Sequence, residues 1–159
     1  MDLVLQAAGA SVLSLPSNEL YAAMQTGACD AALTSSTSLT SFRLEEIAKH
    51  LTTGRAKSYW FMLEPLLMSK AVFDRLSSEE RDIIMSVGAE LEEYGRAAAV
   101  QDDIRVAKVY EAAGATIHDL DGSVLGDWRN LARETAWKDY ANKNENCARL
   151  IKLAMEAGA

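Results

Sequence analysis

The chain has 159 residues, of which 49% are hydrophobic and 25% charged, so it has enough apolar side chains for a folded core and is unlike a disordered chain. Its formal net charge of −7 argues against a nucleic-acid-binding surface, because phosphate binding needs clustered Lys and Arg. No stretch approaches 18 consecutive apolar residues, which excludes a membrane-spanning helix, and no signal-peptide pattern is visible.

Four elements are expected in the first 33 residues: a helix over 2–8, a strand over 11–15, a helix over 19–26 and a buried strand over 29–33. Gly9, Pro16 and Gly27 provide the breaks between them. The two cysteines, Cys29 and Cys147, are far apart and lack metal-type spacing, so each is expected to be an ordinary thiol.

A run of five hydroxyl residues, 34–38, follows the second predicted strand and precedes a helix expected over residues 39–50. A polar loop between a strand and a helix is typical of a ligand-binding loop in an open α/β sheet, because ligands bind beyond the carboxyl ends of strands. The same run could instead cap the helix without binding a ligand, since Ser and Thr are favoured N-cap residues. The pattern leaves both interpretations open.

The most hydrophobic stretch is residues 58–69, which is rich in β-forming residues and interrupted by Pro65. We expect two strands that meet near this proline, preceded by a polar connection over 51–57 and followed by a short helix over 70–76. Successive aromatic residues at 59–61 would point to opposite faces of an extended segment. One face belongs to a core, and the other is left for a cleft or for solvent.

Residues 78–113 have no proline and predict one unbroken helix that ends at Gly114. Such a helix would be about 54 Å long, whereas a globule of this chain length has a diameter near 40 Å. The helix must therefore project or belong to something larger. Its apolar stripe changes face near Gly95, which indicates either two lobes on opposite sides or a gentle kink. A strand over 115–120 and helices over 124–140 and 146–157 complete the chain.

Nothing in the sequence nominates a catalytic centre. His50 and His118 lie in different predicted elements and are expected to be separate surface residues. The acidic pairs 92–93 and 102–103 are adjacent on the long helix, so their side chains diverge and are expected to face solvent. No nucleophile or nucleotide-binding motif is present. We therefore expect neither an enzyme nor a protein with a cofactor or a metal.

The order of these elements resembles the periplasmic substrate-binding proteins of TRAP transporters, the DctP family. Three segments of the chain carry this resemblance: residues 14–36, 44–54 and 64–90. The first has Glu19, Tyr21, Ala23, Gln25, Gly27 and Asp30, with Ala31 where the family usually has glycine. The third has Met68, Ser69, Phe73, Leu76 and Glu79. A very long helix that bridges two lobes is also typical of the family.

The resemblance implies an α/β fold: the C-terminal half of a periplasmic-binding-protein-like molecule, with mixed sheet pieces and a very long bridging helix. Within residues 1–159 it implies a ligand-loop segment over 1–57, crossover strands over 58–77, a spine helix over 78–114, and a closing strand and helices over 115–159. The N-terminal half that the family adds would be missing from this chain.

The resemblance also places the ligand-binding residues at Ser17, Thr34, Ser35, Tyr59 and Trp60. The family's most characteristic ligand group is an arginine that clamps the substrate carboxylate.

That arginine precedes the helix with which this chain begins. No arginine precedes Arg43, so the clamp is expected to be absent, and neither Arg43 nor Arg55 matches its position.

The function implied is the binding of a small organic acid in the periplasm for delivery to the membrane permease subunits of a TRAP transporter. Further partners would be the missing N-terminal half or a second copy of the chain, and no nucleic acid. The alternative is a free-standing protein-interaction module that uses the long helix and an exposed apolar face. We expect the isolated chain to bind carboxylates weakly and to self-associate.

Overall fold

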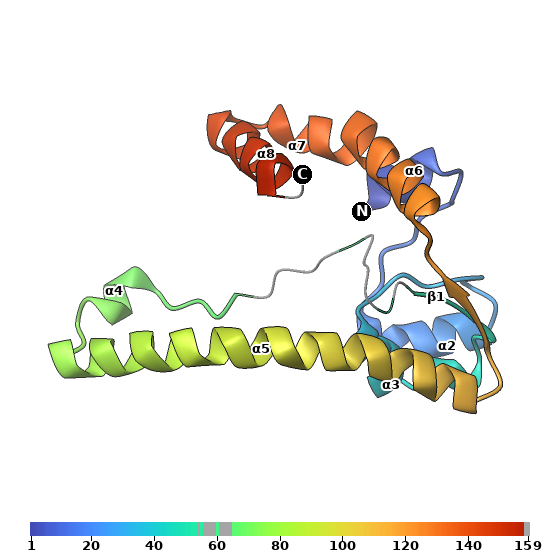
Figure 1. The fold of residues 1–159 in the computed structure, drawn as a ribbon, viewed down its shortest axis with the longest axis horizontal. Helices are drawn as coiled ribbons and strands as arrows, with labels where there is room; N and C mark the ends of the chain where they lie inside the picture. Colours follow the sequence, from blue (N-terminus) through green and yellow to red (C-terminus); the bar gives the residue numbers. More distant parts are fainter. Residues whose placement is uncertain (54, 56–59, 61–64, 158–159) are drawn as a thin grey trace. The chain divides into compact units, whose positions relative to one another are not determined.

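The computed structural model describes residues 1–53, 55, 60 and 65–157, which form two compact units. One unit combines the two ends of the chain, Met1–Pro16 and Leu120–Ala159, and the other is the continuous segment Ser17–Asp119 (Figure 1). Within the described residues the fold is mostly helical with one small parallel sheet. No helix among these residues is both long and apolar enough to cross a bilayer.

The Ser17–Asp119 unit carries the sheet and the longest helix. In chain order its elements are η1 Ser17–Glu19, α2 Leu20–Gln25, α3 Ser36–Ser41, η2 Leu44–Glu46, β1 His50–Thr53, α4 Lys70–Phe73, α5 Ser78–Ala112 and β2 Thr116–Asp119. The helix before Gly27, the short helix near residue 70, the long helix and the strand before residue 120 confirm the sequence-based predictions.

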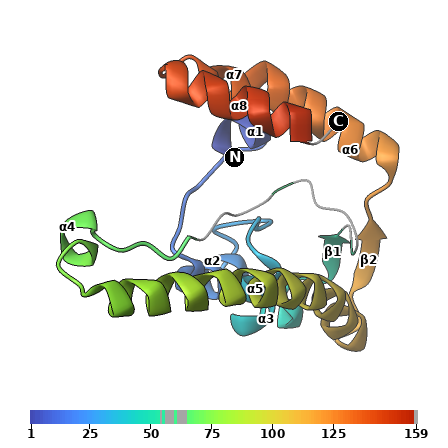
Figure 2. The same cartoon turned by 60° about the vertical axis from the view of Figure 1, so that its left-hand side comes forward.

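The sheet consists of β1 and β2, which pair in parallel with His50 opposite Thr116 and Thr52 opposite His118 (Figure 2). Side chains alternate between the two faces of a strand. Leu51 and Ile117 belong to the hydrophobic core, whereas the residues on either side of them are exposed. One face of the sheet is therefore polar and open to solvent.

The core of this unit joins α5 to the segment that precedes β1. Leu44, Leu51, Val106 and Tyr110 are its buried members. Half-buried apolar side chains pack around them: Leu20, Tyr21, Met24, Leu39, Phe42, Ile47, Ala48, Ala115 and Ile117. The core thus lies at the C-terminal end of α5, where α3 and the sheet meet the helix (Figure 1).

The start of α5 is fixed by a capping box rather than by a single hydroxyl. Ser77, not Ser78, is the N-cap: its Oγ accepts a hydrogen bond from the Glu80 backbone N–H at 3.2 Å, and the Ser77 backbone N–H donates to Glu80 Oε2 at 2.8 Å. The helix then runs for 35 residues without a break at Gly95. It ends before Gly114, whose φ of +76° is the left-handed conformation that glycine adopts freely.

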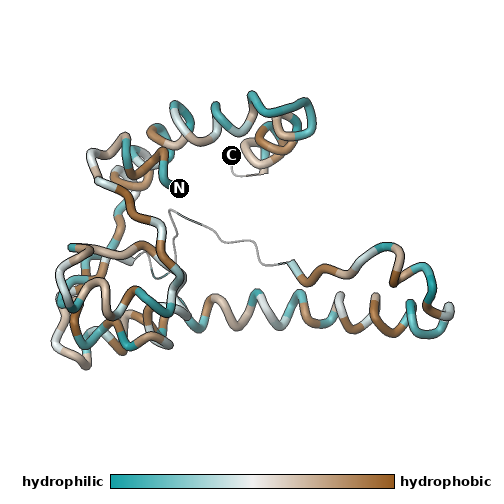
Figure 3. The backbone as a smooth tube through the Cα atoms, turned by 180° about the vertical axis from the view of Figure 1, so that it is seen from behind, coloured by the Kyte–Doolittle hydropathy of each residue, from teal (hydrophilic) through white to brown (hydrophobic). Residues whose placement is uncertain are grey.

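Burial along α5 is uneven. Its three buried residues, Val106, Ala107 and Tyr110, all lie in the last third. Apolar residues nevertheless recur along the whole helix (Figure 3). In the first two thirds large apolar side chains such as Met85 and Tyr94 are 62% and 71% exposed.

In its described part, the other unit has helices and connecting segments but no strand. Its elements are α1 Asp2–Ala7, α6 Gly122–Ala132, the π-helical turn η3 Arg133–Trp137, α7 Lys138–Ala141 and α8 Glu145–Ala157. α1 packs against α6 and η3, and α7 packs against α8. The carboxylate of Asp121 caps α6 by accepting hydrogen bonds from the Ser123 and Val124 backbone N–H groups. The helices predicted over 2–8, 124–140 and 146–157 are confirmed.

Several sequence-based predictions are wrong. Residues 11–15 and 29–33 are not strands, and residues 39–50 form α3, η2 and the start of β1 instead of one helix. A strand needs a hydrogen-bonded neighbour, and neither apolar segment has one among the described residues. Of the predicted crossover strands, residues 58, 59 and 61–64 lie outside the described residues, and residues 65–69 form no strand.

Candidate functional site

The hydroxyl run 34–38 is largely occupied by hydrogen bonds within the chain. Ser35 is the N-cap of α3, and its Oγ accepts a hydrogen bond from the Ser38 backbone N–H at 3.2 Å. The Ser35 hydroxyl also donates to Ser38 Oγ at 3.0 Å. The capping interpretation of this run is therefore confirmed for Ser35, although a capping hydroxyl can still accept a further hydrogen bond.

Two further hydroxyls of the run connect α3 to the long helix. Ser36 Oγ donates to Asp103 Oδ1 at 2.5 Å, and Thr37 Oγ1 donates to Asp102 Oδ2 at 2.9 Å. The prediction that Asp102 and Asp103 only face solvent is wrong, because the packing of α3 on α5 brings these hydroxyls onto both half-buried carboxylates. Hydrogen bonds to ionised acceptors are stronger than neutral ones, so they fix the position of the loop.

Thr34 is the one member of the run whose hydroxyl makes no hydrogen bond within the described part of the chain. The residue is half-buried, and it directly precedes the cap of α3. Its neighbours on the C-terminal side are held by the contacts with α5. With respect to the described residues, the run therefore offers one hydroxyl without a hydrogen bond, on a loop anchored by its neighbours.

The other predicted ligand-binding residues are only partly described. Ser17 begins η1 and is half-buried, and Trp60 is also half-buried. Tyr59 lies outside the described residues. The sequence also predicts that these side chains converge on one pocket, because Thr34 would follow a strand over 29–33, but residues 29–33 form no strand. Their convergence on one pocket stays a prediction.

Arg55 forms ion pairs with two of the chain's own carboxylates. Its Nε donates to Asp119 Oδ1 at 2.7 Å, and one Nη donates to Glu111 Oε1 at 2.9 Å. The hydrogen bond to Asp119, followed by the one to Glu111, raises the pKa of the guanidinium. A ligand carboxylate would have to displace these partners, so Arg55 is poorly suited to act as a clamp.

A shallow pocket near α2 is lined by Tyr21, Ser41, Phe42, Arg43 and Glu46. Tyr21 Oη donates to Glu46 Oε2 at 2.9 Å, and the same carboxylate forms an ion pair with Arg43. The hydrogen bond to Glu46 is the main cause of the raised pKa of Tyr21. The polar groups of Tyr21, Arg43 and Glu46 in this pocket thus bond to one another.

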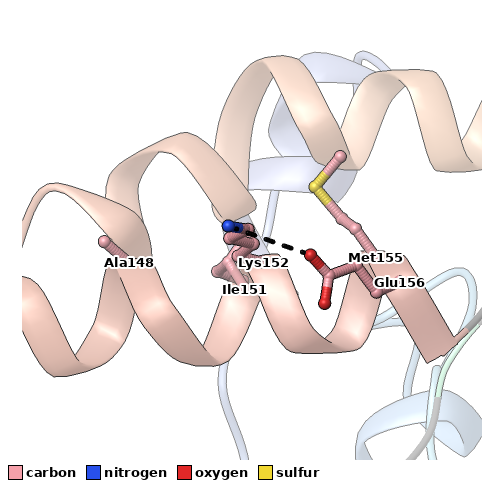
Figure 4. Close-up of a pocket in the computed structure, with 5 residues that line it drawn as sticks. All are labelled: Ala148, Ile151, Lys152, Met155 and Glu156. Atoms are coloured by element: carbon pink, nitrogen blue, oxygen red, sulfur yellow. Dashed lines mark ion pairs between the residues drawn. The ribbon is translucent and has the colours of Figure 1, made fainter.

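A second shallow concavity lies on α8, and it is lined by Ala148, Ile151, Lys152, Met155 and Glu156 (Figure 4). Its charged residues, Lys152 and Glu156, are one helical turn apart, with Nζ and Oε1 separated by 4.0 Å. All of its lining residues come from one helix, so no polar groups converge on it from different elements. It lacks the arrangement that a small-molecule site requires.

Sequence reasoning missed one polar cluster altogether. His50 and His118 were expected to be separate, but the pairing of β1 with β2 places His50 Nδ1 3.0 Å from His118 Nε2. The sequence pattern did not indicate β1, because His50–Thr53 has only one apolar side chain, Leu51. Among the described residues there is no group of three or more potential metal ligands.

Comparison with known proteins identifies the family. Residues 1–144 match the family described as bacterial extracellular solute-binding protein, family 7 (DctP). The chain belongs to this family. A solute-binding protein from Albidiferax ferrireducens is 61% identical over 156 residues, which are 98% of this chain and 46% of that protein.

Solved structures show the same fold. A TRAP periplasmic solute-binding protein from Rhodoferax ferrireducens, crystallised with bound malonate, is 61% identical, with a TM-score of 0.91 over 98% of this chain and 49% of that one. A marine metagenome TRAP solute-binding protein specific for aromatic acids is 22% identical, with a TM-score of 0.75 over 96% of this chain and 50% of that one. This DctP-family chain therefore spans about half the length of its relatives and has half of their fold.

Proposed function

We propose that this chain is part of a periplasmic TRAP-type solute-binding protein that binds a small organic acid and delivers it to a membrane permease. The observation that carries the proposal is the likeness to the malonate-bound TRAP protein, at 61% identity and a TM-score of 0.91. The relatives are solute-binding proteins rather than enzymes, which agrees with the lack of a catalytic constellation in the sequence.

The proposed ligand is a small aliphatic carboxylate of the malonate type. The 61% identical protein holds malonate, whereas the aromatic-acid binder is only 22% identical and supports the fold alone. The family resemblance places the arginine that clamps such a ligand in the part of the protein outside this chain. Within the chain, Arg43 and Arg55 pair with Glu46 and with Asp119 and Glu111.

The proposed contribution of this chain is the loop before α3. Thr34 offers a hydroxyl without a hydrogen bond in the described part of the chain, and Ser35 is adjacent to it. A neutral hydroxyl can donate to a carboxylate oxygen without the desolvation cost of a second charge. Ser17, Tyr59 and Trp60 are proposed as further lining residues of the same pocket.

The partner proposed for the first two thirds of α5 is the remainder of the solute-binding protein. Large apolar side chains are strongly exposed here and in the segment before α4, where Leu66 and Leu67 are 91% and 82% exposed. Contiguous exposed apolar surface usually marks an interface. The alternative partners for this surface are a second copy of the chain and, if the chain is an interaction module, an unrelated protein.

The test is a chimera in which this chain replaces the matching 156 residues of the Albidiferax relative. Calorimetry should detect malonate binding by the chimera and at least about 100-fold weaker binding by the isolated chain, because a bidentate arginine pair is among the strongest contacts. Thr34→Val should weaken binding by the chimera roughly 10- to 100-fold, since a ligand oxygen left unpaired costs about 1–3 kcal/mol.

Thr26→Val is the matched control, because Thr26 is exposed and its hydroxyl bonds only to backbone carbonyls of its own helix. It should leave the affinity unchanged. A folded chimera without affinity for malonate or other small acids would overturn the proposed function. Tight binding by the isolated chain would contradict the role of the missing half, and an unaffected Thr34→Val chimera would remove the hydroxyl from the site.

A further inference from the structure

Two imidazole rings from distant parts of the chain meet on the solvent-facing side of the sheet. The parallel register places His50 and His118 on the same face as Thr52 and Thr116, opposite the core residue Leu51. The distance between His50 Nδ1 and His118 Nε2 is 3.0 Å, and the ring centroids are 5.3 Å apart with 24° between the planes. β1 and β2 run side by side here (Figure 2).

This separation matches the spacing of two imidazole ligands on one metal ion. Imidazole nitrogens bind such ions at about 2.0–2.1 Å. Two of them in neighbouring positions of a square-planar or tetragonal ion are then about 2.9 Å apart, and about 3.3 Å apart in a tetrahedral one. We propose that His50 and His118 chelate a single divalent transition-metal ion, with Cu²⁺ preferred and water completing its coordination.

Metal binding by the two rings needs no proton donor or acceptor other than the rings and solvent. In the hydrogen bond one ring nitrogen donates its N–H and the lone pair of the other accepts it, so this lone pair becomes a metal ligand once the hydrogen bond opens. The donor ring becomes the second ligand when its proton moves to its other nitrogen through solvent. The number of protons on the pair is unchanged, and both rings rotate so that their lone pairs converge on the metal ion instead of pointing at each other.

Basic side chains close to the pair are held by other partners. Lys49 Nζ donates to the Glu45 and Ala113 carbonyl oxygens, and Arg55 is paired with Asp119 and Glu111. The net charge of −7 adds a general attraction for cations. The sheet also holds the two strands side by side, so the second nitrogen binds intramolecularly once the first has bound.

The chain has only two histidines, so no other imidazole competes for the metal ion in the test. The full 159-residue chain carrying Cys29→Ser and Cys147→Ser, which remove the competing thiols, should bind one equivalent of Cu²⁺ in mildly alkaline buffer. Affinity should decrease from Cu²⁺ to Ni²⁺, and Mg²⁺ should not compete. His50→Gln and His118→Gln should each lower the Cu²⁺ affinity roughly 100-fold, because each leaves a single imidazole.

Thr52→Val is the control, since Thr52 shares the face of the sheet but has no imidazole, and it should leave the affinity unchanged. In the protein with both histidines, paramagnetic Cu²⁺ should broaden the ring-proton NMR signals of both together at sub-stoichiometric concentration. Broadening of only one signal, or an affinity unaffected by either histidine substitution, would overturn the proposal. The NMR measurement decides the question even if a histidine variant fails to fold.

Discussion

The first two thirds and the last third of α5 share one continuous helical backbone but have opposite environments. Val106 and Tyr110 near its end are each 1% exposed, whereas Ile83 and Tyr94 earlier in the helix are 56% and 71% exposed. Both parts contain large apolar residues at helical spacing. Helix formation and burial are therefore separate properties here: composition and caps specify the helix, and the described residues bury only one end of it.

The largest expected difference between the two parts comes from a matched pair of tyrosines. Tyr110→Ala should lower the free energy of unfolding by about 3–5 kcal/mol, because it removes a fully buried aromatic side chain. Tyr94→Ala should change it by no more than about 0.5 kcal/mol. Urea unfolding followed by circular dichroism measures both.

Equal effects of the two substitutions would mean that the described packing does not stabilise the unit.

The comparison can also be sharpened in the chimera with the Albidiferax relative. If the remainder of the solute-binding protein covers the exposed part of α5, Tyr94→Ala should clearly destabilise the chimera, while the effect of Tyr110→Ala should be the same as in the isolated chain.

A smaller effect is expected at the start of the exposed part. Ser77→Ala removes the capping box and should destabilise the first turns of α5 by about 1 kcal/mol. Amide hydrogen exchange of these turns should accelerate, while exchange near Tyr110 should not change. Ser86→Ala, in the exposed part of the same helix but away from the cap, is the control.

The same cap predicts a dependence on pH. The hydrogen bonds from Ser77 lower the pKa of Glu80. Their stabilising contribution is therefore present above the ordinary glutamate pKa and is lost as the pH falls through the lowered value. Protection of the first turns should decrease in this acidic range. Ser77→Ala should only weaken the dependence, because the backbone N–H of residue 77 can still donate to the Glu80 carboxylate.

The smallest effect at neutral pH is expected from Tyr110→Phe. The Tyr110 hydroxyl is buried and has no hydrogen-bond partner among the described residues, so its removal should change stability by at most about 0.5 kcal/mol. At alkaline pH the two proteins should differ. Burial, and then the charge of Glu45, raise the pKa of Tyr110 from 10.0 to about 12.

The folded state binds the hydroxyl proton of Tyr110 more tightly than the unfolded state does. The stabilising contribution of this proton is therefore complete below pH 10.0 and is lost as the pH rises to about 12. Unfolding midpoints measured across this range should fall less in Tyr110→Phe than in the unsubstituted chain. Tyr94→Phe, which alters an exposed tyrosine of the same helix, should retain the full alkaline loss.

The long helix could be predicted because its signals are local. Ser77 and Glu80 form a capping box, Gly114 ends the helix, and no proline lies between them. The strands could not be predicted equally well, because a strand depends on its neighbour. Residues 11–15 and 29–33 look like strands but have no strand partner among the described residues, whereas His50–Thr53 looks polar and pairs with β2.

In the candidate site, too, the local features could be predicted from the sequence and the long-range contacts could not. The hydroxyl run at residues 34–38 was recognised from the sequence, and the capping role of Ser35 was one of its two interpretations. The contacts of Ser36 and Thr37 with the acidic pair of α5 depend on how the chain folds back across more than 60 residues, which no local pattern reveals.

The parallel pairing of β1 with β2 has a kinetic consequence. His50 and His118 are 68 positions apart, and the contacts of α3 with α5 span 65 and 67 positions. Closing a flexible loop of this length costs about 4 kcal/mol of chain entropy. Helices form within about a microsecond, whereas contacts of large sequence separation form late. During refolding we therefore expect helical signal to appear first and protection of the sheet last, with the closing of this loop as the slow step for the Ser17–Asp119 unit.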